Sequence, residues 1–247
     1  MSVTGQFNYV GGQTRYGHFE DFIGLGADSG AYSGGYTGVT ESSGTAAVAA
    51  GGLDGLFTLT TGTGSGNRSM VVSGLNYRAS DNGIVMEAGV SITSLASCAV
   101  FVGWTDTTSI EMPFTVSGTT ITSNATDAVG LLFDSAATSS TSWLALGVKN
   151  DSDTALTVVN SAFSPTAGAT NFQNIRVQVD TNGFAYFFIN GNQVAVQNLN
   201  TSTGQTGLAN AITTTAAVTP IVCIRTGTTA AKTATVDYMY AQKGRKY

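Results

Sequence analysis

One stretch, residues 174–196, restricts the fold more strongly than any other part of the chain. From Asn174 to Asp180, apolar and polar residues alternate, which is the period-2 pattern of a strand with one solvent-facing side. The segment Asp180–Gly183 then supplies a turn, because Asn and Gly tolerate the positive φ that tight hairpins require. A second apolar run, Phe184–Ile189, ends at Asn190-Gly191, which is a strong hairpin signal. The stretch therefore predicts three strands joined by two tight turns.

Short apolar runs separated by turn residues continue through most of the chain. No window of a dozen residues combines a 3.6-residue period with good helix formers. Charged residues make up only 10% of the chain, which argues against solvent-facing helices rich in Glu and Lys. The sequence therefore predicts an all-β protein. We expect further strands at residues 22–25, 53–60, 70–72, 84–92, 99–104, 114–116, 120–122, 130–133, 143–149, 156–159, 218–225 and 233–240.

Strands that follow one another without helical crossovers can be joined by hairpins and Greek-key connections, which pair them antiparallel. No internal repeat is visible, which disfavours a propeller or a solenoid, and no Pro- or Ser-rich linker divides the series. We therefore expect one antiparallel double-sheet jelly-roll sandwich over residues 18–241. Residues 1–17 are interpreted as an N-terminal arm and residues 242–247 as a basic C-terminal tail.

The distribution of charge limits the classes of partner. The formal net charge is −5, and Lys243, Arg245 and Lys246 form a local basic exception near the C-terminal end. Nucleic-acid binders usually present a basic face, so we expect no nucleic-acid partner. The basic cluster is either a solvated terminus or a contact with an acidic neighbouring subunit, and it is the candidate partner-binding site.

Membrane and secretion signals are not found in the sequence. No run approaches 18 continuous apolar residues, so we expect no membrane span. The first residues lack a basic region followed by an apolar core, so we expect no signal peptide. Cys98 and Cys223 both lie in apolar runs and are interpreted as buried free thiols, with a disulfide between them as the alternative.

Few residues could carry catalysis. The single histidine, His18, cannot by itself form a His-based metal cluster, and no nucleophile-elbow motif accompanies it. Glycoside hydrolysis needs two carboxylates in one cleft, and the chain contains no Glu-x-Asp-x-Glu triplet. Glu87 and Glu111 are instead isolated among apolar residues. We therefore expect a non-enzyme with no catalytic residue, no metal site and no cofactor.

Two weaker signals concern binding. The segment Asp151–Asp153 could offer oxygens to calcium, with a solvated loop as the alternative interpretation. Four aromatic residues could stack on sugars, although both tryptophans lie in apolar runs that fit a core better. These four residues are Tyr32, Tyr36, Trp104 and Trp143.

Several of the expected strands resemble a known family. Residues 174–195 resemble the late hairpin of the concanavalin A-like lectin/glucanase jelly roll. Thr233–Tyr240, with its apolar-Asp-Tyr pattern, resembles the closing strand of that superfamily. Residues 51–62, 83–90 and 100–106 are similar to the version carried by tailed-phage virion proteins. The resemblance covers most of residues 19–241, and its motifs are strands and turns rather than ligands.

The resemblance implies the structural branch of this superfamily, because the glucanase carboxylate motif and the legume-lectin metal loop have no match here. It implies a non-enzymatic capsid decoration protein of a tailed phage, acting as a homotrimer. The implied partners are the major capsid protein or other virion proteins, and the implied location is the virion, assembled in the host cytoplasm. The alternative is a carbohydrate-binding host-attachment module of a phage particle, with a glycan as the partner.

Overall fold

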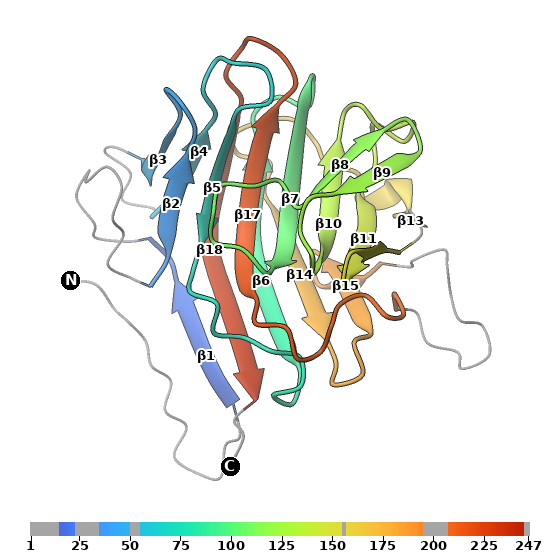
Figure 1. The fold of residues 1–247 in the computed structure, drawn as a ribbon. Helices are drawn as coiled ribbons and strands as arrows, with labels where there is room; N and C mark the ends of the chain where they lie inside the picture. The colour runs from blue at the N-terminus through green and yellow to red at the C-terminus, as the bar shows by residue number, and fades with distance from the viewer. Residues whose placement is uncertain (1–14, 23–34, 50–54, 155–156, 195–206, 245–247) are drawn as a thin grey trace.

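Figure 1 shows the fold of the protein in a computed structural model, which describes residues 15–22, 35–49, 55–154, 157–194 and 207–244. Two antiparallel sheets pack face to face, one behind the other in this view. The described residues contain one 3-10 helix, η1 (Ser161–Phe163), and no α-helix. None of their helical segments is long and apolar enough to cross a membrane. The prediction of an all-β, antiparallel double-sheet sandwich of jelly-roll type is confirmed.

Sheet A has the strand order β16-β15-β14-β6-β18-β4-β3, and β1 pairs with the C-terminal half of β18. Its strands are β1 (Arg15–Glu20), β3 (Thr45–Val48), β4 (Phe57–Thr60), β6 (Ile84–Ile92), β14 (Gln173–Val179), β15 (Ala185–Ile189), β16 (Asn192–Gln193) and β18 (Thr233–Gly244).

Sheet B has the order β12-β11-β10-β7-β17-β5-β2, with β13 paired to β11. Its strands are β2 (Thr37–Thr40), β5 (Arg68–Val72), β7 (Cys98–Thr105), β10 (Ala128–Asp134), β11 (Leu144–Lys149), β12 (Ser152–Asp153), β13 (Thr157–Val158) and β17 (Thr219–Thr226). A separate hairpin consists of β8 (Phe114–Ser117) and β9 (Thr120–Ser123).

The main hydrophobic core lies between the two sheets. Alternate residues of each strand enter it, for example Val177 on β14 and Val102 on β7. Trp104 and Trp143 are fully buried there, which confirms that they belong to the core. The indole N–H of Trp104 donates a hydrogen bond to the Val177 carbonyl oxygen (3.4 Å), so this ring also links sheet B to sheet A.

A second hydrophobic core covers the outer face of sheet B. The β8–β9 hairpin and its preceding loop lie over this face, and Phe114 packs on Phe101 of β7 with ring centroids 5.6 Å apart. Cys223 of β17 is buried in the same cluster. Because both of its faces are covered, β7 is buried along its whole length. This explains why residues 99–104 form a continuous apolar run rather than an alternating one.

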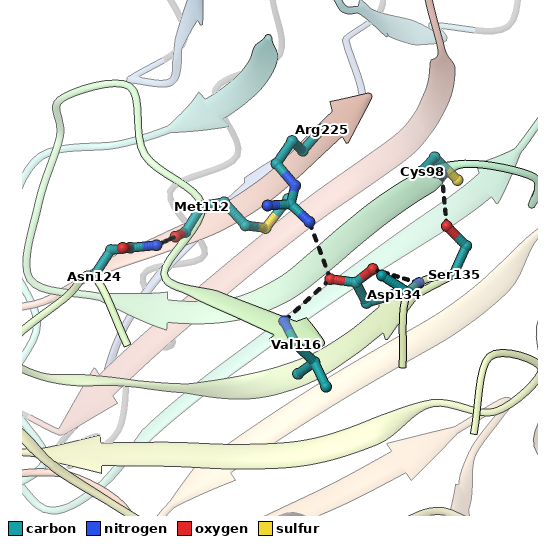
Figure 2. Close-up of polar contacts among 8 residues, drawn as sticks. Cys98, Met112, Val116, Asn124, Asp134, Ser135 and Arg225 are labelled. Atoms are coloured by element: carbon teal, nitrogen blue, oxygen red, sulfur yellow. Dashed lines mark hydrogen bonds and ion pairs between the residues drawn. The ribbon is translucent and has the colours of Figure 1, made fainter. Parts of the chain in front are cut away.

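A buried carboxylate attaches the hairpin to sheet B (Figure 2). Asp134 ends β10 and accepts hydrogen bonds from the backbone N–H groups of Val116 (3.3 Å) and Ala136 (2.9 Å). Its Oδ2 also forms an ion pair with Arg225 of β17 at 3.2 Å. The Asp134 side chain is 1% exposed, so all of these bonds lie in a poorly solvated place. One side chain thus joins β8, β10 and β17.

The two cysteines are free and buried, as expected from their sequence context. Burial raises the pKa of the Cys98 thiol to about 11, and burial likewise raises the pKa of Cys223. Both groups are therefore protonated at neutral pH.

Most of the expected strands are present, and the first expected strand, at residues 22–25, is described only at Phe22. Phe22 is buried outside any strand, with a φ of 55°, and the rest of the expected strand 22–25 lies outside the described residues. The first described strand is β1, which lies across the predicted boundary between arm and sandwich at residues 17 and 18. At the other end, β18 extends to Gly244, three residues beyond the predicted boundary at residue 241. Backbone pairing to β18 orders a segment that has no apolar alternation of its own.

Candidate functional site

The outer face of sheet A contains a groove of about 360 Å³. Strand periodicity creates it, because Ile175 and Val177 of β14 point into the core while Arg176 and Gln178 point outward. We refer to it as the sheet A groove. It is lined by Phe19 of β1, Val85 and Glu87 of β6, Arg176 and Gln178 of β14, and Tyr238, Tyr240 and Gln242 of β18.

The register of sheet A aligns these side chains in rows that cross the strands. One row runs from β15 to β1 through Phe188, Arg176, Glu87, Tyr240 and Phe19. Directly opposed residues in antiparallel strands have neighbouring side chains, so the charged pair in the middle is flanked by aromatic rings.

A parallel row contains Tyr186, Gln178, Val85 and Gln242. The two rows place side-chain amides beside the charged pair, along the same outward face of the sheet. The Tyr240 hydroxyl donates to the Gln242 Oε1, which links the two rows on β18.

A β-bulge directs Tyr238 into the groove. Between Val236 and Met239, two residues of β18 lie opposite a single residue of β6, Gly89. A Cβ atom at Gly89 would lie 3.0 Å from the Tyr238 ring, so any other residue there would force the ring to shift by a few tenths of an ångström. The ring in turn stacks on Phe19 of β1, with centroids 5.8 Å apart.

Tyr238 and Glu87 form one hydrogen-bonded unit. The Tyr238 hydroxyl donates to Glu87 Oε1 at 2.6 Å. Burial, together with the bond to the Glu87 carboxylate, raises the pKa of Tyr238 well above its usual value of 10. The Tyr238 hydroxyl therefore keeps its proton and remains a hydrogen-bond donor. It occupies Oε1 of Glu87 and does not bind Oε2.

Arg176 is held by stacking rather than by an ion pair. Its guanidinium carbon lies 4.0 Å from the centroid of the Phe188 ring, the geometry of a cation–π contact. Among the described residues, Nε of Arg176 is buried and has no hydrogen-bond partner. The guanidinium therefore has a fixed plane and an unused donor.

The predicted basic cluster is described only in part. The amine of Lys243 donates to the Asn76 carbonyl oxygen (2.5 Å) and lies 3.9 Å from Asp81 Oδ2, so these intramolecular contacts occupy it. Arg245 and Lys246 lie outside the described residues. Partner binding by these three residues stays a prediction.

The other candidate residues from the sequence do not line the sheet A groove. His18 stacks on Tyr36, with ring centroids 4.9 Å apart, and Tyr36 is fully buried. Asp153 borders a second hollow, of about 520 Å³, beside Lys149 and Asn210. No group of three or more His, Cys, Asp or Glu side chains in the described parts of the chain is arranged to hold a metal ion. Tyr32 lies outside those parts.

Sequence reasoning missed the groove, although it predicted three of its four strands. The sequence shows Glu87 only as an isolated carboxylate, because its partner Tyr238 lies 151 residues further along the chain. One signal was present in the sequence: Asp237 and Tyr238 interrupt the alternation between Val236 and Met239, which is the pattern of a bulge.

Comparison with known proteins shows that the fold of this chain is similar to that of several solved structures. No protein-family model and no curated protein sequence matches the chain. A crystal structure of a protein of unknown function from Shewanella oneidensis MR-1 is similar, with a TM-score of 0.58 and 10% identity, covering 97% of this chain and 91% of that one. Peanut lectin is similar with a TM-score of 0.55 and 12% identity, covering 92% of this chain and 97% of its own. The cellulose-induced protein Cip1 has a TM-score of 0.53 and 12% identity, covering 90% and 95%.

These neighbours have the concanavalin A-like lectin/glucanase fold, so that part of the resemblance seen in the sequence is confirmed. Sequence identities this low show that the fold is similar, and they say nothing about activity. Function therefore has to be argued from the surface of this chain.

Proposed function

We propose that the chain is a non-enzymatic structural protein of a tailed-phage particle, a decoration protein that acts as a homotrimer through contacts between subunits. One observation carries the proposal: the composition of the outer face of sheet A. Its two cross-strand rows present tyrosine, phenylalanine, arginine and glutamine, with one valine, one glutamate and no lysine. Protein interfaces are enriched in Tyr, Phe and Arg and depleted in Lys, Glu and Asp.

The two faces of the sandwich differ, which supports docking through sheet A. The outer face of sheet B is covered by the chain's own hairpin and a second hydrophobic core. The corresponding face of sheet A has no such cover among the described residues, and Phe19 on it is 36% exposed. A molecule with one closed and one open face can attach to a shell through the open one.

The absence of an enzymatic role is part of the same proposal. Glu87 is the single carboxylate lining the sheet A groove, and Tyr238 holds one of its oxygens. Hydrolysis of a glycosidic bond uses an acid and a second carboxylate across the bond. Asp237, at the bulge, is not part of the lining. Incubation with a soluble β-glucan is expected to release no reducing ends.

Co-sedimentation with particles of the virus that encodes the chain tests the proposal. The purified chain is mixed with particles lacking it, and the pelleted fraction is measured. Tyr240→Ala and Arg176→Ala are expected to weaken pelleting by about tenfold or more, as truncated interface anchors do. The control is Thr122→Ala, an exposed position of β9 on the closed side. If the wild-type chain does not pellet, and particles without it are equally stable, the proposal is wrong.

Glycan binding is the second candidate function, and the groove itself favours it. Sites for small polar ligands are concave, lined by aromatic side chains, and supplied with a few positioned polar groups. The sheet A groove has all three properties, and its volume lies within the ~300–1,000 Å³ usual for such sites.

A further inference from the structure

The two charged residues of the sheet A groove form a complementary donor and acceptor pair. Arg176 and Glu87 are directly opposed across β14 and β6. No ion pair within 4.0 Å joins Arg176 to any carboxylate in the described parts of the chain, because Phe188 holds the guanidinium and Tyr238 holds the carboxylate. Each charge is thus fixed separately while it faces the same groove.

The unused atoms define what a ligand has to offer. The guanidinium of Arg176 lines the groove without an ion pair to any described carboxylate, and Glu87 Oε2 is an acceptor not used by Tyr238. Hydrogen bonds to a charged donor are stronger than those between neutral groups, so an acceptor placed against the guanidinium is favoured. The ligand must therefore accept from Arg176 and donate to Glu87.

A hydroxyl group can do both, because it has one donor hydrogen and two acceptor lone pairs. A carboxylate or phosphate could pair with Arg176, and it would then face the negative charge of Glu87 with no proton to donate. The guanidinium and the carboxylate together leave the groove without net charge, which gives an anion no electrostatic advantage.

Aromatic rings and amides complete the site. Tyr238 and Phe19, stacked at 5.8 Å, form an apolar wall on the β1 side. The apolar C–H face of a pyranose ring can pack on such a wall while its hydroxyl edge reaches the charged pair. Gln178 and Gln242 stand in the neighbouring row, one position along the groove, and can serve the next sugar unit.

We propose that the sheet A groove binds a neutral glycan, with Arg176 donating to and Glu87 accepting from hydroxyls of the same sugar unit. This inference rests on the second candidate function and specifies its ligand class. Tyr238 orients Glu87, and Phe188 orients Arg176.

Binding of the full chain to three soluble polymers tests this inference by calorimetry: a β-glucan, dextran and polygalacturonate. We expect binding of at least one neutral polymer and none of the uronate polymer. Arg176→Lys keeps the charge and removes the planar guanidinium, and is expected to weaken neutral-glycan binding about tenfold, since a hydrogen bond to a charged group is worth about that factor. Arg78→Lys, at an exposed arginine outside the groove, is the matched control and is expected to have no effect.

The variant Glu87→Gln separates this inference from a general affinity for sugars. It keeps an oxygen for Tyr238 and removes the negative charge, so neutral binding is expected to fall while uronate binding appears. If the wild type binds polygalacturonate in preference to the neutral polymers, the proposed neutral ligand class is wrong, while the proposal of glycan binding remains. If no polymer binds while particle co-sedimentation persists, the glycan site is wrong and the structural role stands. Thermal melting of each variant shows that it is folded.

Discussion

Burial of Glu111 disfavours the charged form of its carboxyl group. Its Oε1 is buried without a hydrogen-bond partner among the described residues. Burial, and secondarily the negative charge of Asp106, raise the pKa of Glu111, and Arg68 offsets part of this shift. The sequence showed only a glutamate in an apolar setting, because Asp106 and Arg68 reach it through the packing of the loop onto sheet B.

This shift predicts how stability depends on pH. With a raised folded-state pKa, the folded protein binds more protons than the unfolded chain between 4.5, the ordinary value for glutamate, and the raised value. The free energy of unfolding therefore falls as the pH rises through that window. Glu111→Gln removes the carboxylate whose ionisation lowers the stability. At pH 7 the free energy of unfolding of the variant should therefore exceed that of the wild type, by up to about 1 kcal/mol after solvent screening. Urea unfolding at pH 7 and at pH values below 4.5 measures the difference, which should shrink in acid.

A neighbouring carboxylate provides the control for Glu111. Glu41 is paired with Arg68 at 3.1 Å and also accepts from the Arg68 backbone N–H at 2.9 Å. Glu41→Gln should therefore destabilise the protein at pH 7, with the opposite sign. If both variants shift stability in the same direction, the contribution assigned to burial of Glu111 is wrong.

Among the elements, the strands differ in how readily the sequence reveals them. In β14 and β15 apolar and polar residues alternate because one face of the sheet is exposed to solvent. In β7 the residues are continuously apolar because both faces are covered. β2 and β3 consist of Thr, Gly, Ala and Val at half-buried edge positions, so neither signal is present. The sheet A groove needs the order and register of four strands, which local patterns do not contain.

The attachment of the β8–β9 hairpin predicts a large effect from one substitution. Asp134→Asn removes the charge that Arg225 pairs with and leaves a guanidinium only 21% exposed. Breaking such a pair on one side, with weaker bonding to Val116 as well, should cost about 2–4 kcal/mol. The free energy of unfolding in urea measures this cost.

A double-mutant cycle distinguishes loss of the ion pair from general damage to the hairpin. If the pair matters, the cost of Asp134→Asn should be much smaller in an Arg225→Met background, because no cation is then left unpaired. Equal costs in the two backgrounds would mean that Arg225 contributes nothing to holding the hairpin.

For the whole molecule, the difference between a closed and an open face should be visible in amide exchange. β7 is bonded on both edges, to β10 and β17, and covered on both faces, whereas β1 is bonded along one edge to β18. Amides of Cys98–Thr105 should exchange only through global unfolding, at least about 100-fold more slowly than those of Arg15–Glu20, which open locally. Hydrogen–deuterium exchange with mass spectrometry on the isolated chain and on the particle-bound chain measures both segments. The proposed docking through sheet A should slow exchange in β1 and leave β7 unchanged, and slowing confined to the β8–β9 side would place the contact on the opposite face.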